Sequence, residues 1–429
     1  MTLFRETLAM PQPTLRWISR PASRRAGALA AALAAGFGLA QAAETAAPVS
    51  AVASRVEATS DHSRLVFEMT GAVTPAAHVV ANPARVLVDL PEVAFRIDPR
   101  EGRTPAGSKL IKSYRYGQFA PGRSRVVVDL AGPARIVRAE SEPAGDGARL
   151  ILELASTSES RFNAEAAENA AAIAKTEPAP TPAGVVPAAS DKPVVVIDPG
   201  HGGVDMGATG KHGEQEKAIV FEFAKVLAAK IEAGGRLKAV LTRSEDVFLP
   251  LNERVRLAHQ ANAALFLSIH ADTLAEGHVE GATVYTVSNK ASDAEAARIA
   301  EKENLADQAA GLDGKADVEQ VGDILFDLTQ RETRAFSAQF SQALISRWKE
   351  AGSLNKNPAR SAGFVVLKSY DVPSALLELG YLSSEKDLAR LTSPDWRDRA
   401  AGKTAEAIEA FFAARQREAR APATPSRPQ

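Results

Sequence analysis

The sequence predicts two domains: a small all-β sandwich, and after it an α/β domain in which helices flank a mixed, twisted sheet. Three observations lead to this fold class. The chain has 429 residues, more than one hydrophobic core usually organises. Residues 50–155 contain short runs of alternating apolar and polar residues bounded by Gly, Pro, Asn or Asp. Residues 193–413 instead alternate strand-like and helix-like patterns, which favours a sheet covered on both faces.

Composition limits the kinds of function. Lys and Arg number 51 against 52 Asp and Glu, so the chain has no electrostatic footprint for nucleic acid. Cysteine is absent, which excludes a disulfide framework, a thiolate zinc site and a cysteine nucleophile. Any metal site must therefore be built from histidines and carboxylates.

Residues 1–42 are expected to form a signal peptide. The start is basic, and the apolar stretch at residues 26–40 is too short to span a membrane as a stable helix. The tripeptide "AQA" at residues 40–42 fits the small-residue cleavage rule. The alternative is a disordered, alanine-rich tail. "SRR" at residues 23–25 is compatible with twin-arginine export. We therefore expect an exported protein without a transmembrane segment.

The β-rich region repeats itself. "SRLVFEMTG" (63–71) matches "SRVVVDLAG" (124–132), and "ARVLVDL" (84–90) matches "ARLILEL" (148–154). Two similar halves predict a sandwich with pseudo-twofold symmetry. Residues 156–192 are rich in Ala, Pro and Glu without an apolar face, so we expect an extended, mobile linker. The tail at 414–429 has the same character and is expected to be disordered.

Each element of the α/β domain has its own pattern. The run 216–231 places apolar residues on one helical face, and helices are also expected at 251–262 and within 317–350. Strands are expected at six apolar runs: 194–198, 238–243, 264–272, 280–287, 363–367 and 374–380.

Polar side chains follow three of these strands. His201 comes after "VVVIDPG", His270 ends "ALFLSI", and Glu378 lies inside "SALLELG". Active groups in open α/β sheets collect at the carboxyl ends of strands. Glu214 and Glu216 stand at the start of the first helix. Two histidines, a glutamate and a water would complete the tetrahedral zinc site of a hydrolase, and a separate carboxylate such as Glu378 would transfer the proton.

Each of these residues also has an ordinary structural interpretation. His201 could be a turn residue, His270 a strand-end residue and Glu378 a strand-edge acid. Glu216 could be an acid favoured by the helix dipole. Only the combination, at the ends of buried strands, indicates a metal-dependent hydrolase.

Five motifs in order resemble the zinc-dependent N-acetylmuramoyl-L-alanine amidases with a type-3 catalytic domain: "IDPGHGG", "EK" opening a helix, "LTR" with a following Asp, "SIHAD", and "PSALLELGYLS". The resemblance implies that His201, Glu216 and His270 hold Zn²⁺ and that Glu378 is catalytic. Glu214 is the alternative ligand but is not followed by lysine. Tyr381 and Ser384, where the family more often has Phe and Asn, are mild departures.

The repeat at 50–155 is similar to the AMIN domain that precedes such amidases in Gram-negative bacteria. The resemblance implies a periplasmic enzyme that binds peptidoglycan and cleaves the amide between N-acetylmuramic acid and L-alanine during septal wall splitting. It implies an activator protein with a LytM-type domain. A different exported zinc hydrolase, or a wall-binding protein with a degenerate site, are the alternatives. No coiled-coil heptad occurs, so a monomer is expected.

The segment 291–330 holds a candidate gate. "SDAEAARIAEKENLADQAAG" begins with a capping box from Ser292 to Glu295 and has a thin apolar face, so it would pack weakly. In division amidases of this family a helix here covers the zinc, which makes Glu303 the candidate blocking residue. The alternative is a solvated surface helix.

Overall fold

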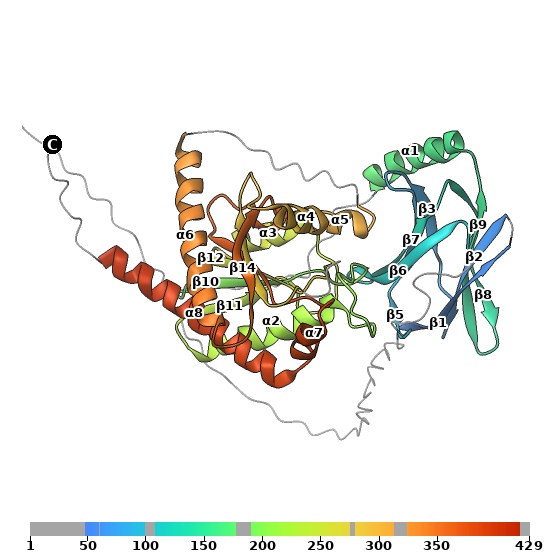
Figure 1. Cartoon of the computed structure of the whole chain (residues 1–429). Helices are drawn as coiled ribbons and strands as arrows, with labels where there is room; N and C mark the ends of the chain where they lie inside the picture. Colours follow the sequence, from blue (N-terminus) through green and yellow to red (C-terminus); the bar gives the residue numbers. More distant parts are fainter. Residues whose placement is uncertain are drawn as a thin grey trace, which may run out of the picture. The chain divides into compact units, whose positions relative to one another are not determined.

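The computed structural model describes residues 48–59, 61–98, 108–176, 190–274, 279–312 and 324–420 (Figure 1). The signal peptide predicted for 1–42 lies outside these ranges. Among the helices of the described residues, none combines the length and the apolar character that crossing a bilayer requires.

The first domain is a sandwich of two antiparallel-rich sheets. The five-stranded sheet has the order β5-β1-β2-β9-β8 and the four-stranded sheet the order β3-β4-β7-β6. The strands are β1 (Val49–Ala58), β2 (His62–Met69), β3 (Ala76–Val80), β4 (Arg85–Pro91), β5 (Val93–Phe95), β6 (Ile111–Ala120), β7 (Arg123–Leu130), β8 (Ala134–Ala144) and β9 (Gly147–Ser156). Residues of both sheets alternate into one core, which includes Leu65, Phe67, Val88, Val126 and Leu152.

The internal repeat appears in the strand pairing. The matched sequences form β2 and β7 in one case, and β4 and β9 in the other. Strand β2 pairs with β9 in one sheet, whereas β7 pairs with β4 in the other. Each half of the repeat thus contributes one central strand to each sheet. The predicted pseudo-twofold relation accordingly exchanges the two sheets.

The expectation of an extended segment after the sandwich is wrong at its start. Residues Glu159–Thr176 form helix α1. Phe162 and Ala166, one helical turn apart, are buried in the sandwich core. These two side chains anchor a helix whose other residues are mostly polar or Ala, which is why no apolar stripe is visible in the sequence.

The second domain contains a six-stranded mixed sheet with the order β11-β10-β12-β15-β13-β14. Its strands are β10 (Val194–Pro199), β11 (Lys238–Leu241), β12 (Ala263–His270), β13 (Ala282–Val287), β14 (Leu354–Ala362) and β15 (Ser374–Glu378). All neighbours are parallel except β13 and β15. The central strands β10, β12 and β15 therefore end at the same edge.

Helices cover both faces of this sheet (Figure 1). One face packs on α2 (Glu216–Ala233), α6 (Ile324–Trp348) and α8 (Pro394–Arg420), around side chains such as Ile197, Phe223 and Leu267. The other face packs on α3 (Leu251–Gln260), α4 (Ala294–Glu303) and the 3₁₀ turn η1 (Val365–Leu367). The remaining helices are α5 (Ala306–Ala309) and α7 (Glu385–Leu391).

Three local predictions differ from the structure. The run 363–367 is not a strand: it contains η1, and its buried side chains pack on the second face of the sheet. Helix α8 continues to Arg420, into the segment expected to be disordered. Helix α4 is capped by Asp293, whose side chain accepts from the N–H of Ala296, so the cap lies one residue after the expected Ser292.

Candidate metal centre

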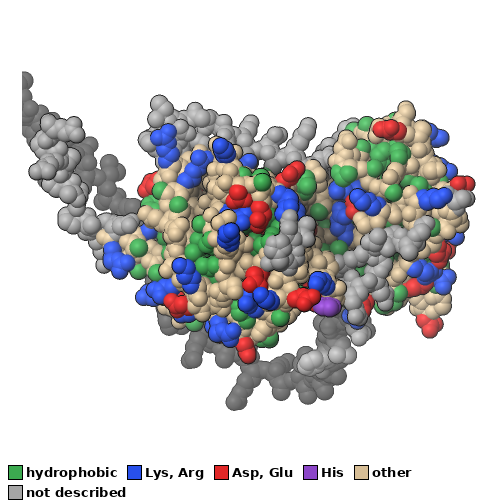
Figure 2. Space-filling model, in the orientation of Figure 1, with side chains coloured by type: hydrophobic (Ala, Val, Ile, Leu, Met, Phe, Trp, Pro, Cys, Tyr) green, Lys and Arg blue, Asp and Glu red, His purple; other side chains and the backbone are tan. Residues whose placement is uncertain are grey.

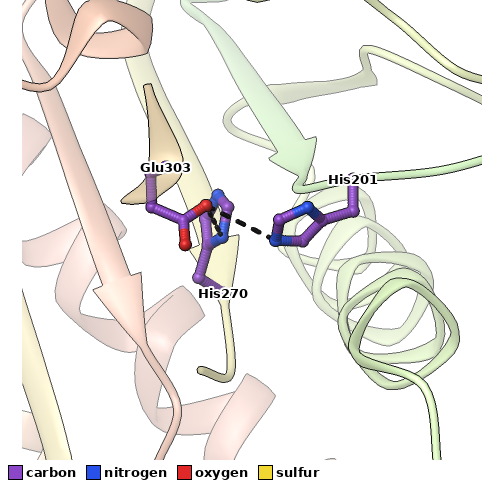
Figure 3. A group of neighbouring side chains, drawn as sticks. All are labelled: His201, His270 and Glu303. Carbon is purple, nitrogen blue, oxygen red and sulfur yellow. Dashed lines mark ion pairs between the residues drawn. The ribbon is translucent and has the colours of Figure 1, made fainter. Parts of the chain in front are cut away.

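The structure brings the three strand-end residues to one edge of the sheet. His270 is the last residue of β12 and lies in register with Glu378, the last residue of β15. His201 follows the neighbouring strand β10. The imidazole rings of His201 and His270 meet edge to face, with their centroids 4.9 Å apart (Figure 3).

The bare glycine loop around His201 has a steric cause. A Cβ atom at Gly200 would lie 2.4 Å from Cε1 of His270, and one at Gly207 would lie 2.6 Å from Oε2 of Glu216. His201 itself has a φ of 59°, in the left-handed region that few non-glycine residues adopt. Glycine at positions 200 and 207 therefore leaves the space that the imidazole of His270 and the carboxylate of Glu216 occupy.

His201 is oriented by a carboxylate that the sequence did not reveal. Its Nδ1 lies 2.8 Å from Oδ2 of Asp205, four residues later. Its Nε2 is buried without a hydrogen-bond partner among the described residues, although carboxylate oxygens lie 3.2 and 3.4 Å away. A carboxylate on one ring nitrogen typically holds a metal-binding histidine in its tautomer.

The carboxylate of Glu216 contacts the imidazoles of both His201 and His270. Its two oxygens lie 3.2 Å from Nε2 of His201 and 3.2 Å from Nδ1 of His270. Both also accept backbone N–H groups, from Ala208 and Ala271, at 2.7 and 2.9 Å. Glu214 instead accepts from the backbone of His212, so Glu216 is the carboxylate that the structure brings to the histidines.

Glu303, the last residue of α4, occupies the remaining side of this cluster. Its Oε2 lies 3.1 Å from Nδ1 of His270 and 3.4 Å from Nε2 of His201 (Figure 3). The ligand atoms of His201, His270 and Glu303 are all within 4.8 Å of one another. Burial lowers the pKa of His270, but the neighbouring carboxylates outweigh it and raise that pKa to about 10.

Glu378 is fully buried beside this cluster. Its Oε2 accepts the backbone N–H of Asp272 at 3.1 Å, and its Oε1 has no hydrogen-bond partner among the described residues. Burial, together with the charges of nearby carboxylates, raises the pKa of Glu378 well above its usual value. A carboxyl group with a raised pKa holds a proton more readily than an exposed carboxylate does, as a general acid requires.

Two buried arginines hold the loop that carries His201. Arg243 donates to the carbonyls of Pro199 and Gly200, and Arg254 donates to that of His201 at 2.9 Å. Arg254 also pairs with Asp198, in the strand before the loop, at 2.8 Å. The only sequence signal of this scaffold was the arginine of the "LTR" motif.

The residues fit a zinc ion. Two imidazole nitrogens and carboxylate oxygens converge, all on buried side chains, and the donor set matches that of hydrolytic zinc sites. The unpartnered Nε2 of His201 is a buried acceptor or donor that a metal would satisfy.

The chain is similar in sequence to known amidases. The N-acetylmuramoyl-L-alanine amidase family model matches residues 195–410, and the AMIN domain model matches residues 53–154. The amidase AmiC of Escherichia coli O6:H1 is 32% identical over 384 residues, covering 86% of this chain and 91% of the relative. The amidase AmiA of Escherichia coli K12 is 38% identical over 222 residues, covering 52% of this chain and 76% of the relative.

The chain is also similar to a solved structure. The amidase AmiC2 of Nostoc punctiforme is 27% identical and covers 52% of this chain and 99% of its own, with a TM-score of 0.38.

Proposed function

Since this chain belongs to the N-acetylmuramoyl-L-alanine amidase family, we propose that it works through a zinc ion held by His201, Glu216 and His270, and that it acts in septal wall splitting. The enzyme is a peptidoglycan amidase. The observation that carries the proposal is the position of Glu216, whose two oxygens each lie 3.2 Å from one of the histidines.

Zinc in this position would polarise the scissile carbonyl and lower the pKa of a water molecule to about 7. The chain's own residues supply the rest. Asp205 fixes the ring of His201 through Nδ1, which directs Nε2 toward the centre. The backbone N–H groups of Ala208 and Ala271 hold the carboxylate of Glu216 in place.

Glu378 is the proton carrier of the proposed reaction. Its carboxyl lies beside His270, at the end of the adjacent strand, and one of its oxygens has no hydrogen-bond partner among the described residues. It takes a proton from the attacking water and gives it to the alanine nitrogen as the amide bond breaks. The products are a lactyl carboxylate on the glycan and a stem peptide with a free amino terminus.

Glu303 is the proposed regulatory residue. Its carboxylate lies where a substrate carbonyl would have to approach the two histidines. Helix α4 contributes only small or single apolar groups to the core, namely Ala296, Ile299 and Ala300. The apolar contacts of this helix therefore hold it only weakly, and the ion pairs of Glu303 with His201 and His270 are contacts that have to be replaced when it is displaced. A LytM-type activator would release it.

The remaining assignments follow the family. Residues 50–155 would form the AMIN domain that binds peptidoglycan, and residues 193–413 the catalytic domain. The proposed location is the periplasm, after export of the chain and removal of residues 1–42.

Product analysis on purified peptidoglycan tests the reaction. We expect glycan strands with free lactyl carboxylates and intact stem peptides that begin with L-alanine. Glu378→Gln should retain one zinc per chain and lose activity, whereas His201→Ala should lose both. Glu214→Gln, an acid two residues from Glu216 that does not reach the histidines, is the matched control and should retain both. Cut stem peptides or released acetate would instead assign a peptidase or a deacetylase.

A cellular assay tests the septal role. Cells lacking the protein should form chains of unseparated daughters, and the intact chain should restore separation. The Glu378→Gln variant should not. Normal separation with this variant would contradict the proposed role while leaving the biochemical reaction in place.

A further inference from the structure

Asp272 is a buried carboxylate close to the reacting groups. It lies two residues beyond His270, and its backbone N–H donates to Oε2 of Glu378 at 3.1 Å. Its backbone carbonyl accepts from the N–H of Leu382 at 2.7 Å. These two bonds fix the backbone of Asp272 relative to Glu378, so its side chain has a defined place beside the proton carrier.

Only one oxygen of the Asp272 carboxylate has hydrogen-bond partners among the described residues. Its Oδ1 accepts the backbone N–H of Thr273 at 2.5 Å and contacts Nζ of Lys302. Its Oδ2 is buried and has no hydrogen-bond partner among the described residues. Among the described residues, the cation that pairs with it is therefore Lys302 of helix α4.

Lys302 and Glu303 are consecutive residues, so they must leave the centre together. Once α4 withdraws, Asp272 is a buried carboxylate without its cation. An unpaired buried charge is strongly unfavourable. A different N–H donor in the position of Lys302 would restore the lost ion pair.

The surroundings of this pair leave room for such a donor. A cavity of about 180 Å³ is lined by Asp272, Thr273, Leu274, Arg298, Ile299 and Lys302. The pair thus faces open space rather than a packed core. A cavity of this size holds several non-hydrogen atoms of a peptide.

We propose that Asp272 binds the alanine amine that the cleavage releases, and that Lys302 occupies its position while α4 covers the centre. This inference rests on the proposed role of Glu378. As the C–N bond breaks, the water oxygen joins the carbonyl carbon and Glu378 delivers one proton to the nitrogen. The carboxylic acid product loses the second proton, and the amine gains one from solvent, which gives a carboxylate and an ammonium. The ammonium is then the group that Asp272 holds.

A binding measurement tests this without relying on turnover. The probes are the dipeptide L-alanyl-γ-D-glutamate, which carries the ammonium, and its N-acetylated form, which does not. In the zinc-loaded Glu303→Gln chain, Asp272→Asn should weaken binding of the free dipeptide about tenfold or more. Binding of the acetylated dipeptide should change less than twofold. Asp371→Asn, a surface acid beside His259, is the matched control.

A second variant keeps the test independent of the folding of Asp272→Asn. In the chain with Glu303 intact, Lys302→Gln should strengthen binding of the free dipeptide at least threefold relative to the acetylated one, because the competing ammonium is gone. Equal effects on both dipeptides in either variant would overturn the proposal.

The two failures can be told apart. If the Glu303→Gln chain cleaves no peptidoglycan, the proposed function fails. If it cleaves peptidoglycan but Asp272→Asn changes the affinity for both dipeptides by the same factor, only the role of Asp272 fails.

Discussion

Oε2 of Glu303 lies 3.1 Å from Nδ1 of His270, so the end of a weakly packed helix touches the residue that ends a central strand. Figure 2 shows the surface of one side of the molecule. The side chains of Glu303, His201 and His270 are buried beneath the protein surface. The contact therefore has to break before a polymer can reach the histidines.

The first prediction concerns this contact. Glu303→Gln should raise the basal amidase activity of the purified chain by about 10- to 100-fold, since a neutral amide competes less well for the metal than a carboxylate. Release of dye from labelled peptidoglycan measures it. Glu301→Gln removes the same charge from an exposed position of the same helix and should leave the rate unchanged. Equal rates for Glu303→Gln and the intact chain would show that α4 is not a gate.

The second prediction is a pH dependence of the metal-free chain. The pKa of His270 is raised to about 10 by its carboxylate neighbours, above the value of about 6.5 in an unfolded chain. A raised folded-state pKa gives stability that is complete below pH 6.5 and is lost as the pH rises toward 10. The free energy of unfolding should fall in this window by at most about 1.4 kcal/mol per pH unit from this group.

Urea unfolding of chelated protein at pH 6, 8 and 9.5 measures this loss. Glu303→Gln removes one of the carboxylates that raise the pKa of His270, so its unfolding free energy should fall less steeply with pH. A slope as steep as that of the intact chain would mean that Glu303 does not interact with the imidazole.

The third prediction compares two arginines at matching positions of the internal repeat, one buried and one exposed. Arg125 pairs with Asp89 at 2.6 and 2.9 Å and is almost fully buried. At the matching position of the other half, Arg64 pairs with Glu153 at 3.1 Å but is about half exposed. Arg125→Gln should destabilise the sandwich by about 2–3 kcal/mol, whereas Arg64→Gln should cost less than about 1 kcal/mol.

Hydrogen exchange of peptides from β4 and β7, compared with those from β2 and β9, reads out each sheet separately. Protection that falls equally in both variants would contradict the dependence on burial.

The sequence predicted that three polar residues would lie close together, because residues at the carboxyl ends of parallel strands meet at one edge of a sheet. Buried runs ending in His201, His270 and Glu378 meet at one edge once β10, β12 and β15 are parallel neighbours. Asp205 and Asp272 were missed, since a single acid in a loop has no periodic signal and its partner is set only by the fold.

The sequence-based predictions of two helical segments were wrong for a different reason. Helix α1 is anchored by Phe162 and Ala166 in the core and by a hydrogen bond from Nδ2 of Asn169 to the carbonyl of Val79. The buried run at 363–367 has the same apolar character as a strand although it contains η1. In short apolar runs and Ala-rich segments, the sequence pattern does not distinguish a helix from a strand or an extended segment, and tertiary contacts decide between them.

The last prediction concerns the glycine before His201. Gly200→Ala adds one methyl group at a backbone conformation open to alanine, but that methyl would lie 2.4 Å from Cε1 of His270. The imidazole must move, and a displaced ligand should lower the zinc affinity by at least about tenfold. Competition with a chromophoric chelator measures the affinity. Gly402→Ala, in helix α8 with no neighbour closer than 3.8 Å, should bind zinc normally and stabilise the helix by about 0.5–1 kcal/mol. Normal zinc affinity in Gly200→Ala would mean that His270 can shift without leaving the metal, and that the bare loop exists for the substrate strand and not for the ligand.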